Sequence, residues 1–279
     1  GNDMKSEIKS ESASLKNWYL AFAIVGVISG FLFIVSYWSD YDREWRKYQD
    51  AYATELRAIV SGSGKQELPT PGYIYNQIVV SPNRVDRCQM CHRALDDPRF
   101  AKSPQPLTTH PKIPSHSFEK FGCTSCHMGQ GRATTVADGH GKVPFWDEPL
   151  RRKPFTQASC GTCHRGVKLK GAPLLARGRQ LYLTMGCIAC HTIHGAGGKL
   201  GPELTWVGDR RKDPEWHLKH FANPQGISPG STMPPYKHLA KKDLEALTVY
   251  MLSLSSAPEG LIAAPNVIQA KVATKPQKK

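Results

Sequence analysis

The sequence predicts a mainly α-helical chain with much irregular structure: one membrane helix, a middle segment with little regular structure, and a small helical domain at the C-terminus. Three observations predict this fold class. An uncharged apolar run stands near the start, helical periodicity recurs on both sides of the middle segment, and all eight cysteines fall in Cys-x-x-Cys-His pentapeptides. We therefore divide the chain into residues 1–16, 17–41, 42–72, 73–171, 172–256 and 257–279.

The first predicted element is the apolar run from Trp18 to Trp38, which contains 21 residues and no charged side chain. At helical rise this run is about 30 Å long, the thickness of a bilayer core. A cleaved signal peptide would have a shorter apolar region that ends in small residues. Residues 17–41 are therefore predicted to form an uncleaved membrane anchor, in which Gly26 and Gly30 have the spacing of a helix-contact motif.

Residues 42–72 are predicted to form a stalk and a linker. Aromatic and aliphatic side chains recur at spacings of three and four from Asp42 to Val60, as on one face of an amphipathic helix. The residues of this stripe are Trp45, Tyr48, Tyr52, Leu56 and Ile59. The following run, 61–72, is rich in Gly, Ser and Pro and reads as a linker.

The cysteine motifs carry the chemistry of the chain. A zinc site needs two Cys pairs per ion and no histidine after each pair, and a thioredoxin-like motif would occur once rather than four times. In a Cys-x-x-Cys-His motif, two thiols bond to a haem and the histidine takes the proximal iron position. The sequence therefore predicts four covalently bound haem c groups, attached at Cys88, Cys91 and His92; Cys123, Cys126 and His127; Cys160, Cys163 and His164; and Cys187, Cys190 and His191.

Three of the four motifs lie in residues 73–171, which are rich in Pro, Gly and short polar runs. Such a composition ordinarily indicates disorder. Three haems can supply the missing apolar core, so we expect a trihaem segment organised around its cofactors. The haem propionates, about eight charges, also offset much of the net charge of +14, which argues against a nucleic-acid partner.

The sixth iron ligands decide between electron transfer and catalysis, because a missing ligand leaves iron free to bind a small molecule. Before Cys160 the chain has three histidines besides the proximal ones, which equals the number of haems there. We expect His110, His116 and His140 to be the sixth ligands, with their pairing left open and with Met90, Met128 and Met185 as alternatives. For the fourth haem the candidate is Met233, in the Pro-rich sequence Ser-Thr-Met-Pro-Pro.

Residues 172–256 resemble a class I cytochrome c domain. The resemblance rests on Gly201-Pro202 and Met233 beyond the fourth motif, and on predicted helices at 174–183 and 244–254, the second capped by Asp243. It implies that the Pro202 carbonyl accepts a hydrogen bond from His191, and that Tyr250 packs on a small residue, Gly178 or Gly186. The remaining histidines are expected to be surface or structural residues, and they are His194, His217, His220 and His238.

The three motifs of the middle segment resemble membrane-anchored multihaem cytochromes that accompany quinol-oxidising cytochrome b and Rieske-type complexes. This resemblance implies a subunit of a respiratory or photosynthetic complex that relays electrons from a membrane partner to a soluble periplasmic acceptor, rather than a catalyst by itself. The alternatives are a stand-alone tetrahaem quinol dehydrogenase and a donor to a reaction centre or terminal oxidase. A catalytic reductase is disfavoured, because no Cys-x-x-Cys-Lys motif occurs and the ligand count leaves no iron open.

The orientation follows from the haems, since basic residues flank the apolar run on both sides. Covalent haem attachment takes place outside the bacterial cytoplasm. We therefore expect a single-pass protein of the inner membrane with a cytoplasmic N-terminus, periplasmic haem domains and a solvated tail at 257–279.

Overall fold

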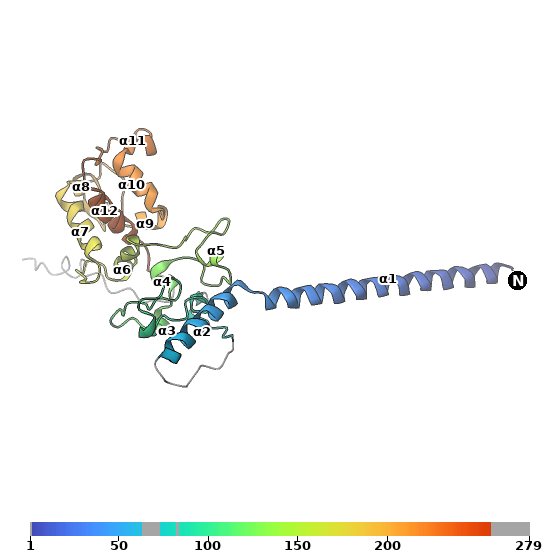
Figure 1. Cartoon of the computed structure of the whole chain (residues 1–279). Helices are drawn as coiled ribbons and strands as arrows, with labels where there is room; N and C mark the ends of the chain where they lie inside the picture. Colours follow the sequence, from blue (N-terminus) through green and yellow to red (C-terminus); the bar gives the residue numbers. More distant parts are fainter. Residues whose placement is uncertain (1, 63–72, 82–83, 258–279) are drawn as a thin grey trace, which may run out of the picture.

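The computed structural model describes residues 2–62, 73–81 and 84–257, with side chains from residue 15 onward. The predominance of helix agrees with the sequence prediction. Figure 1 shows one long helix that projects from a body of short helices and loops. The helices are α1 (Asn2–Tyr41), α2 (Glu44–Gly62), α3 (Phe118–Phe121), α4 (Thr124–His127), α5 (Val136–Gly139), α6 (Ala158–Cys163), α7 (Pro173–Thr184), α8 (Cys187–Cys190), α9 (Val207–Arg210), α10 (Pro214–Ala222), α11 (Pro224–Ile227) and α12 (Lys241–Ser253).

The strands and 3₁₀ helices of the described residues are short. The antiparallel strands are β1 (Ile78–Ser81) with β2 (Arg84–Asp86), and β3 (Thr192–Ile193) with β4 (Ala196–Gly197). The 3₁₀ helices are η1 (Cys88–Met90), η2 (Pro98–Phe100) and η3 (Phe155–Gln157). Two-stranded ribbons of this length do not make a core, so the helices and loops decide the architecture.

Helix α1 contains the predicted membrane span and extends beyond it at both ends. An 18-residue window here has a mean hydropathy of 2.3, and none of it is buried against the rest of the chain. Large apolar side chains, among them Phe22, Phe31 and Ile34, are more than half exposed. A helix with an apolar surface all round is long enough and apolar enough to cross a bilayer.

Helix α2 has the predicted amphipathic character, and its apolar face packs into the body of the protein. Leu56 and Val60 are buried with Phe100 and Leu107, and the ring of Tyr52 stacks on Phe100 at 5.0 Å between centroids. Helix α2 also contacts η1, which carries the first motif. This packing makes α2 part of the core of the middle segment, whereas the sequence had suggested a separate stalk. Most of the expected linker, residues 63–72, lies outside the described residues.

The C-terminal helices form the main hydrophobic core. Helices α7 and α12 cross where Gly178 faces α12: a Cβ at Gly178 would lie 1.9 Å from the carbonyl oxygen of Ala246 and 2.8 Å from Cβ of Tyr250. The close crossing therefore requires glycine. This confirms the predicted contact with Tyr250 and assigns it to Gly178, because nothing lies within 4 Å of a Cβ at Gly186.

Two details differ from the sequence predictions. The N-cap of α12 is Ala240, not Asp243, which lies in the first turn and pairs with Arg177 at 2.8 Å. The predicted domain boundary after residue 171 does not separate two packing units, because Ala158 and Cys160 of α6 contact the C-terminal core. The third motif is therefore held by the C-terminal helices as well as by its own segment.

Candidate haem-binding sites

All four pentapeptides adopt the same local turn. In each one the backbone N–H of the histidine donates to the carbonyl of the first cysteine, at 2.9 Å for His92, His127 and His191 and at 2.8 Å for His164. One helical turn places residues i, i+3 and i+4 on one side. The two thiols and the imidazole of each motif therefore share one face, as covalent haem attachment requires. All eight cysteines are free of disulfides and partly exposed.

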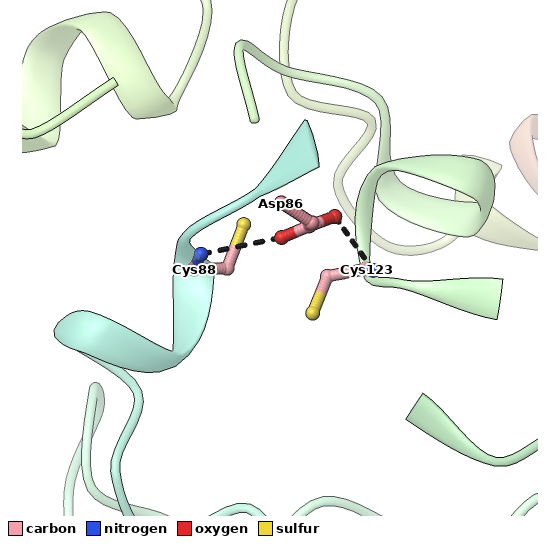
Figure 2. Close-up of side chains that lie close together, drawn as sticks. All are labelled: Asp86, Cys88 and Cys123. Carbon is pink, nitrogen blue, oxygen red and sulfur yellow. Dashed lines mark hydrogen bonds between the residues drawn. The ribbon is translucent and has the colours of Figure 1, made fainter. Parts of the chain in front are cut away.

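The first and second motifs meet at the buried carboxylate of Asp86, as Figure 2 shows. Its Oδ2 accepts the backbone N–H of Cys123 at 2.8 Å and of Thr124 at 2.7 Å, and its Oδ1 accepts that of Cys88 at 3.2 Å. Burial raises the pKa of Asp86, but a hydrogen bond with the Cys88 side chain and these backbone N–H groups outweigh it and hold the pKa below its usual value. Asp86 therefore fixes the two attachment turns against each other as an anion.

Asp86, Cys88 and Cys123 also have ligand atoms within 4.8 Å of one another, the spacing of a metal site. Two features argue against a separate metal ion. The carboxylate is already used by three backbone N–H groups, and both thiols belong to haem-attachment motifs. We therefore interpret this cluster as the point where the first and second predicted attachment turns adjoin.

Backbone groups orient three of the four imidazoles that are predicted to be proximal ligands. Nδ1 of His191 lies 2.8 Å from the carbonyl oxygen of Pro202, as the class I resemblance implies. A Cβ at Gly201 would lie 2.6 Å from the His191 ring, so any larger residue at this position would clash with the imidazole. The His92 and His127 rings also have backbone hydrogen-bond partners, Pro106 for His92 and Arg151 for His127. When Nδ1 carries the proton, Nε2 is left as the iron-binding atom.

The three candidate distal histidines lie near the first three motifs. His110 and His116 each direct Nδ1 at a proline carbonyl, Pro111 at 2.7 Å and Pro114 at 2.8 Å. The His110 ring lies 6.0 Å from the His127 ring, and the His116 ring lies 5.8 Å from the His164 ring. His140 follows α5.

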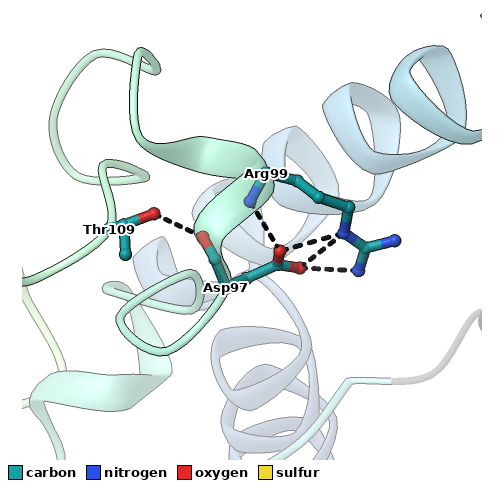
Figure 3. A network of polar contacts seen from close by, with 3 residues as sticks. All are labelled: Asp97, Arg99 and Thr109. Carbon is teal, nitrogen blue, oxygen red and sulfur yellow. Dashed lines mark hydrogen bonds and ion pairs between the residues drawn. The ribbon is translucent and has the colours of Figure 1, made fainter.

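The loop that carries His110 is fixed by a polar network, shown in Figure 3. Asp97 accepts the backbone N–H of Arg99 at 3.0 Å and pairs with its guanidinium at 2.6 Å, while the hydroxyl of Thr109 donates to the Asp97 carbonyl. The backbone N–H of His110 then donates to the carbonyl of Leu95 at 3.0 Å. These contacts close residues 95–110 into a compact loop that ends at His110.

The alternative methionines occupy different environments. Met90 is only 1% exposed and lies under α2, where Gln49 donates to its carbonyl at 3.1 Å. Met128 has a positive φ of 61° directly after a proximal histidine, and Met185 packs against the C-terminal core.

Near the fourth motif, Met233 is partly buried and packs against the C-terminal core together with Cys187. Its loop is held by Tyr236, whose N–H donates to the carbonyl of Phe221 at 2.7 Å and whose hydroxyl donates to that of Met185 at 3.3 Å. The loop thus brings a thioether to the part of the core that surrounds the attachment turn.

Two of the other C-terminal histidines are buried to different degrees. His217 is 2% exposed with Nε2 2.8 Å from the carbonyl of Arg211, a structural role as expected. His220 is half-buried, stacks on Trp216 at 4.7 Å, and has a buried Nδ1 without a hydrogen-bond partner. Burial and the nearby His191 ring lower the pKa of His220, so it lies closer to the fourth motif than the sequence indicated.

Sequence reasoning missed Asp86 and Arg151. Arg151 is 5% exposed, its Nη1 donates to the Ser159 hydroxyl at 2.9 Å, and burial lowers its pKa to about 10. Arg151 is thus a buried cation beside the second and third predicted attachment turns. Neither residue belongs to a motif, so only the tertiary contacts reveal them.

Comparison with known proteins supports the C-terminal site. Residues 196–258 match the family "Cytochrome C oxidase, mono-heme subunit/FixO". The match includes Pro202 and Met233 but neither the fourth pentapeptide nor the first three. A cytochrome c oxidase subunit 2 from Alkalihalophilus pseudofirmus is 33% identical over 88 residues, which cover 29% of this chain and 26% of that protein. The chain thus spans about a quarter of this relative.

These similarities imply a cytochrome c domain with covalently bound haem c at the C-terminal end of the chain. The chain therefore combines a C-terminal region similar to cytochrome c domains of oxidases with a helix, α1, that is long and apolar enough to cross a membrane.

Proposed function

We propose that this chain is a membrane-anchored tetrahaem cytochrome c that carries electrons to a terminal oxidase, as a subunit or as its donor. The observation that carries the proposal is the oxidase-type cytochrome domain at 196–258, which contains the Pro202 carbonyl bonded to His191 and the Met233 loop. Both similar proteins are named for oxidases. They favour an oxidase partner over the cytochrome b/Rieske complex that the sequence resemblance suggested.

The positions of the attachment turns support an electron path, because the first motif adjoins the second and the second adjoins the third. Cys91 lies near Glu44 at the start of α2, where burial and the Glu44 charge raise the pKa of its thiol to about 11. The Cys88 and Cys123 sulfurs belong to one cluster within 4.8 Å. Cys126 lies near Cys160 and Cys163.

Helix α6 then packs on α12, where a Cβ at Gly161 would lie 2.6 Å from Cβ of Ser253. The first three attachment sites therefore adjoin in chain order, and the third is packed on helix α12 of the oxidase-like domain. Haem c supplies a reversible one-electron iron centre at each site. The residues of the chain orient the imidazoles, bury the attachment turns and fix the distances between neighbouring sites.

Ligand type gives the path a direction. A methionine ligand raises the potential relative to a second histidine. Histidine ligands on the first three sites and Met233 on the fourth favour electron flow toward the C-terminal domain. We place α1 in the bacterial inner membrane with the haem-bearing part on the periplasmic side, because covalent haem attachment takes place there.

The first experiment is co-purification. The full chain with an affinity tag on its C-terminus, extracted in mild detergent, is expected to bring down haem–copper oxidase subunits and to carry four haems by mass. Recovery of cytochrome b and Rieske subunits without an oxidase would favour the quinol-relay alternative instead. A chain with one haem would contradict the tetrahaem proposal.

The second experiment tests the fourth site. Met233→His is expected to lower the highest of the four midpoint potentials, on the order of a hundred millivolts within the ~0.8 V range that axial ligands control. The far-red absorption band of a methionine-ligated ferric haem should vanish. His220→Ala is the matched control, since His220 is a half-buried histidine near His191 whose Nδ1 has no hydrogen-bond partner. If His220→Ala changes the spectrum and Met233→His does not, His220 is the ligand.

A further inference from the structure

We propose a specific ligand pairing for the first three haems: His127 with His110, His164 with His116, and His92 with His140. This assignment rests on the tetrahaem function proposed above. It deepens that function, because the sequence leaves open which distal histidine serves which haem.

The ring distances carry the first two pairs. An iron atom that binds a nitrogen of two opposed imidazoles at about 2 Å each sets those nitrogens about 4 Å apart and the ring centres about 6 Å apart. The centroids of His110 and His127 are 6.0 Å apart, and those of His116 and His164 are 5.8 Å apart. Each distal ring therefore already lies at the separation that one shared iron requires.

The hydrogen bonds agree with this geometry. His110, His116 and His127 each use a backbone carbonyl as a partner. A histidine that binds a metal through Nε2 characteristically donates its other ring N–H to such a group. The hydrogen bonds of Asp97 with Arg99 and Thr109 hold the loop that carries His110. The position of the His110 ring is therefore set by internal contacts of this loop.

The remaining pair follows from the elements that carry His92 and His140. The carboxylate of Glu44 in α2 accepts the backbone N–H of Val136, the first residue of α5, at 2.8 Å, and α5 ends directly before His140. The same carboxylate acts on Cys91, the neighbour of His92. His140 is thus brought to the first motif by α2.

This pairing interlaces the segment. The loop between the first and second motifs supplies ligands to the second and third haems, and the loop after the second motif supplies a ligand to the first. Each iron would then cross-link two separate parts of the chain. The longest links would be His92 with His140 and His116 with His164. A segment with short helices and few buried apolar side chains acquires long-range ties in this way.

The test combines a ligand exchange with the loss of one haem. His110→Met is expected to add one far-red methionine band to the ferric spectrum of the full-length tetrahaem protein and to raise one midpoint potential. In a chain that also carries Cys123→Ala and Cys126→Ala, the second haem is absent, and the added band is expected to disappear. With Cys160→Ala and Cys163→Ala instead, the band is expected to persist.

The reciprocal set uses His116→Met, whose band should vanish with loss of the third haem, and His140→Met, whose band should vanish with loss of the first. His238→Met is the control, because His238 is an exposed residue of the C-terminal region, and it should add no band. A band that depends on a different motif, or no added band for His110→Met, would overturn the pairing.

If a haem-deficient variant does not accumulate, an experimental structure of the wild-type holoprotein gives the second measurement. The expected result is Nε2 of His110 and of His127 on one iron, and any other partner for His110 overturns the assignment. The number of haems per chain, measured by mass, distinguishes failure of the tetrahaem function from failure of the ligand pairing. Fewer than four haems would refute the tetrahaem function, whereas four haems with exchanged partners would refute only the pairing.

Discussion

Residues 73–171 and 172–256 are stabilised in different ways. The C-terminal cluster contains 15 buried apolar residues and is built on the crossing of α7 and α12. The cluster that serves the middle segment contains five, two of them from α2. Apolar burial is the main favourable term in folding, so the middle segment has to obtain its order elsewhere. The difference indicates that polar contacts take over part of the role of a core in the middle segment: Asp86 is the hydrogen-bonding hub of the first two motifs, and the loop network around Asp97 closes residues 95–110. The haems proposed for this segment would supply the rest.

The largest expected effect comes from blocking haem attachment by replacing all eight cysteines with alanine. Residues 73–150 are then expected to lose protection from hydrogen exchange almost completely, because binding of the group and folding are coupled. Helices α7 and α12 should retain more protection than the middle segment. Hydrogen exchange with mass spectrometry, with the haem-loaded chain as control, measures this directly. Equal loss in both regions would contradict the comparison.

The next effect is expected for Asp86→Asn. An amide presents a donor to backbone N–H groups that need an acceptor, so the variant should lose about 3 kcal/mol of stability. The measurement is the Tm of the haem-loaded protein. Asp97→Asn is the control, because its carboxylate pairs with an exposed guanidinium and an asparagine still caps the turn. A larger shift for Asp97→Asn would show that Asp86 is not the hub.

The pH dependence of the same variant sharpens this test. The folded-state pKa of Asp86 lies below its unfolded value, so the stability it contributes is fully present above the unfolded pKa of about 3.9. That contribution is lost as the pH falls through the lower folded-state pKa. The Tm difference between wild type and Asp86→Asn should therefore be constant near neutral pH and shrink below pH ~4. A difference that grows on acidification would refute the anionic role.

A smaller effect is expected for Gly178→Ala. The added Cβ overlaps the Ala246 carbonyl, so α7 and α12 must separate, at a cost of about 1–3 kcal/mol. Thermal unfolding followed by circular dichroism measures it. Gly171→Ala is the matched control, because nothing lies within 4 Å of a Cβ there. If both variants behave alike, the close helix crossing is wrong.

The smallest effect is expected for Asp243→Ala. The sequence suggested that Asp243 caps α12, and loss of such a cap lowers stability. In the structure its carboxylate pairs only with an exposed guanidinium of Arg177, an arrangement that contributes little. The variant should unfold at the wild-type Tm. A clear decrease would restore the capping role.

The sequence by itself determined the elements whose signal is local. The apolar run that became α1, the four pentapeptides, and Pro202 beside His191 are readable because length, spacing and adjacent residues define them. The helices α2, α7 and α12 were also expected, since their side chains repeat with helical periodicity. The haem ligands remain predictions that the experiments above test.

Only the tertiary structure decided the relations between distant parts of the chain. Nothing near Asp86 in the sequence indicates that it joins Cys88 to Cys123, and no spacing reveals that His110 faces His127. It also decided that α2 packs on Phe100 and that Gly178, not Gly186, meets α12. The physical reason is that these contacts close long loops, whose ends meet through packing and buried hydrogen bonds that local sequence does not encode.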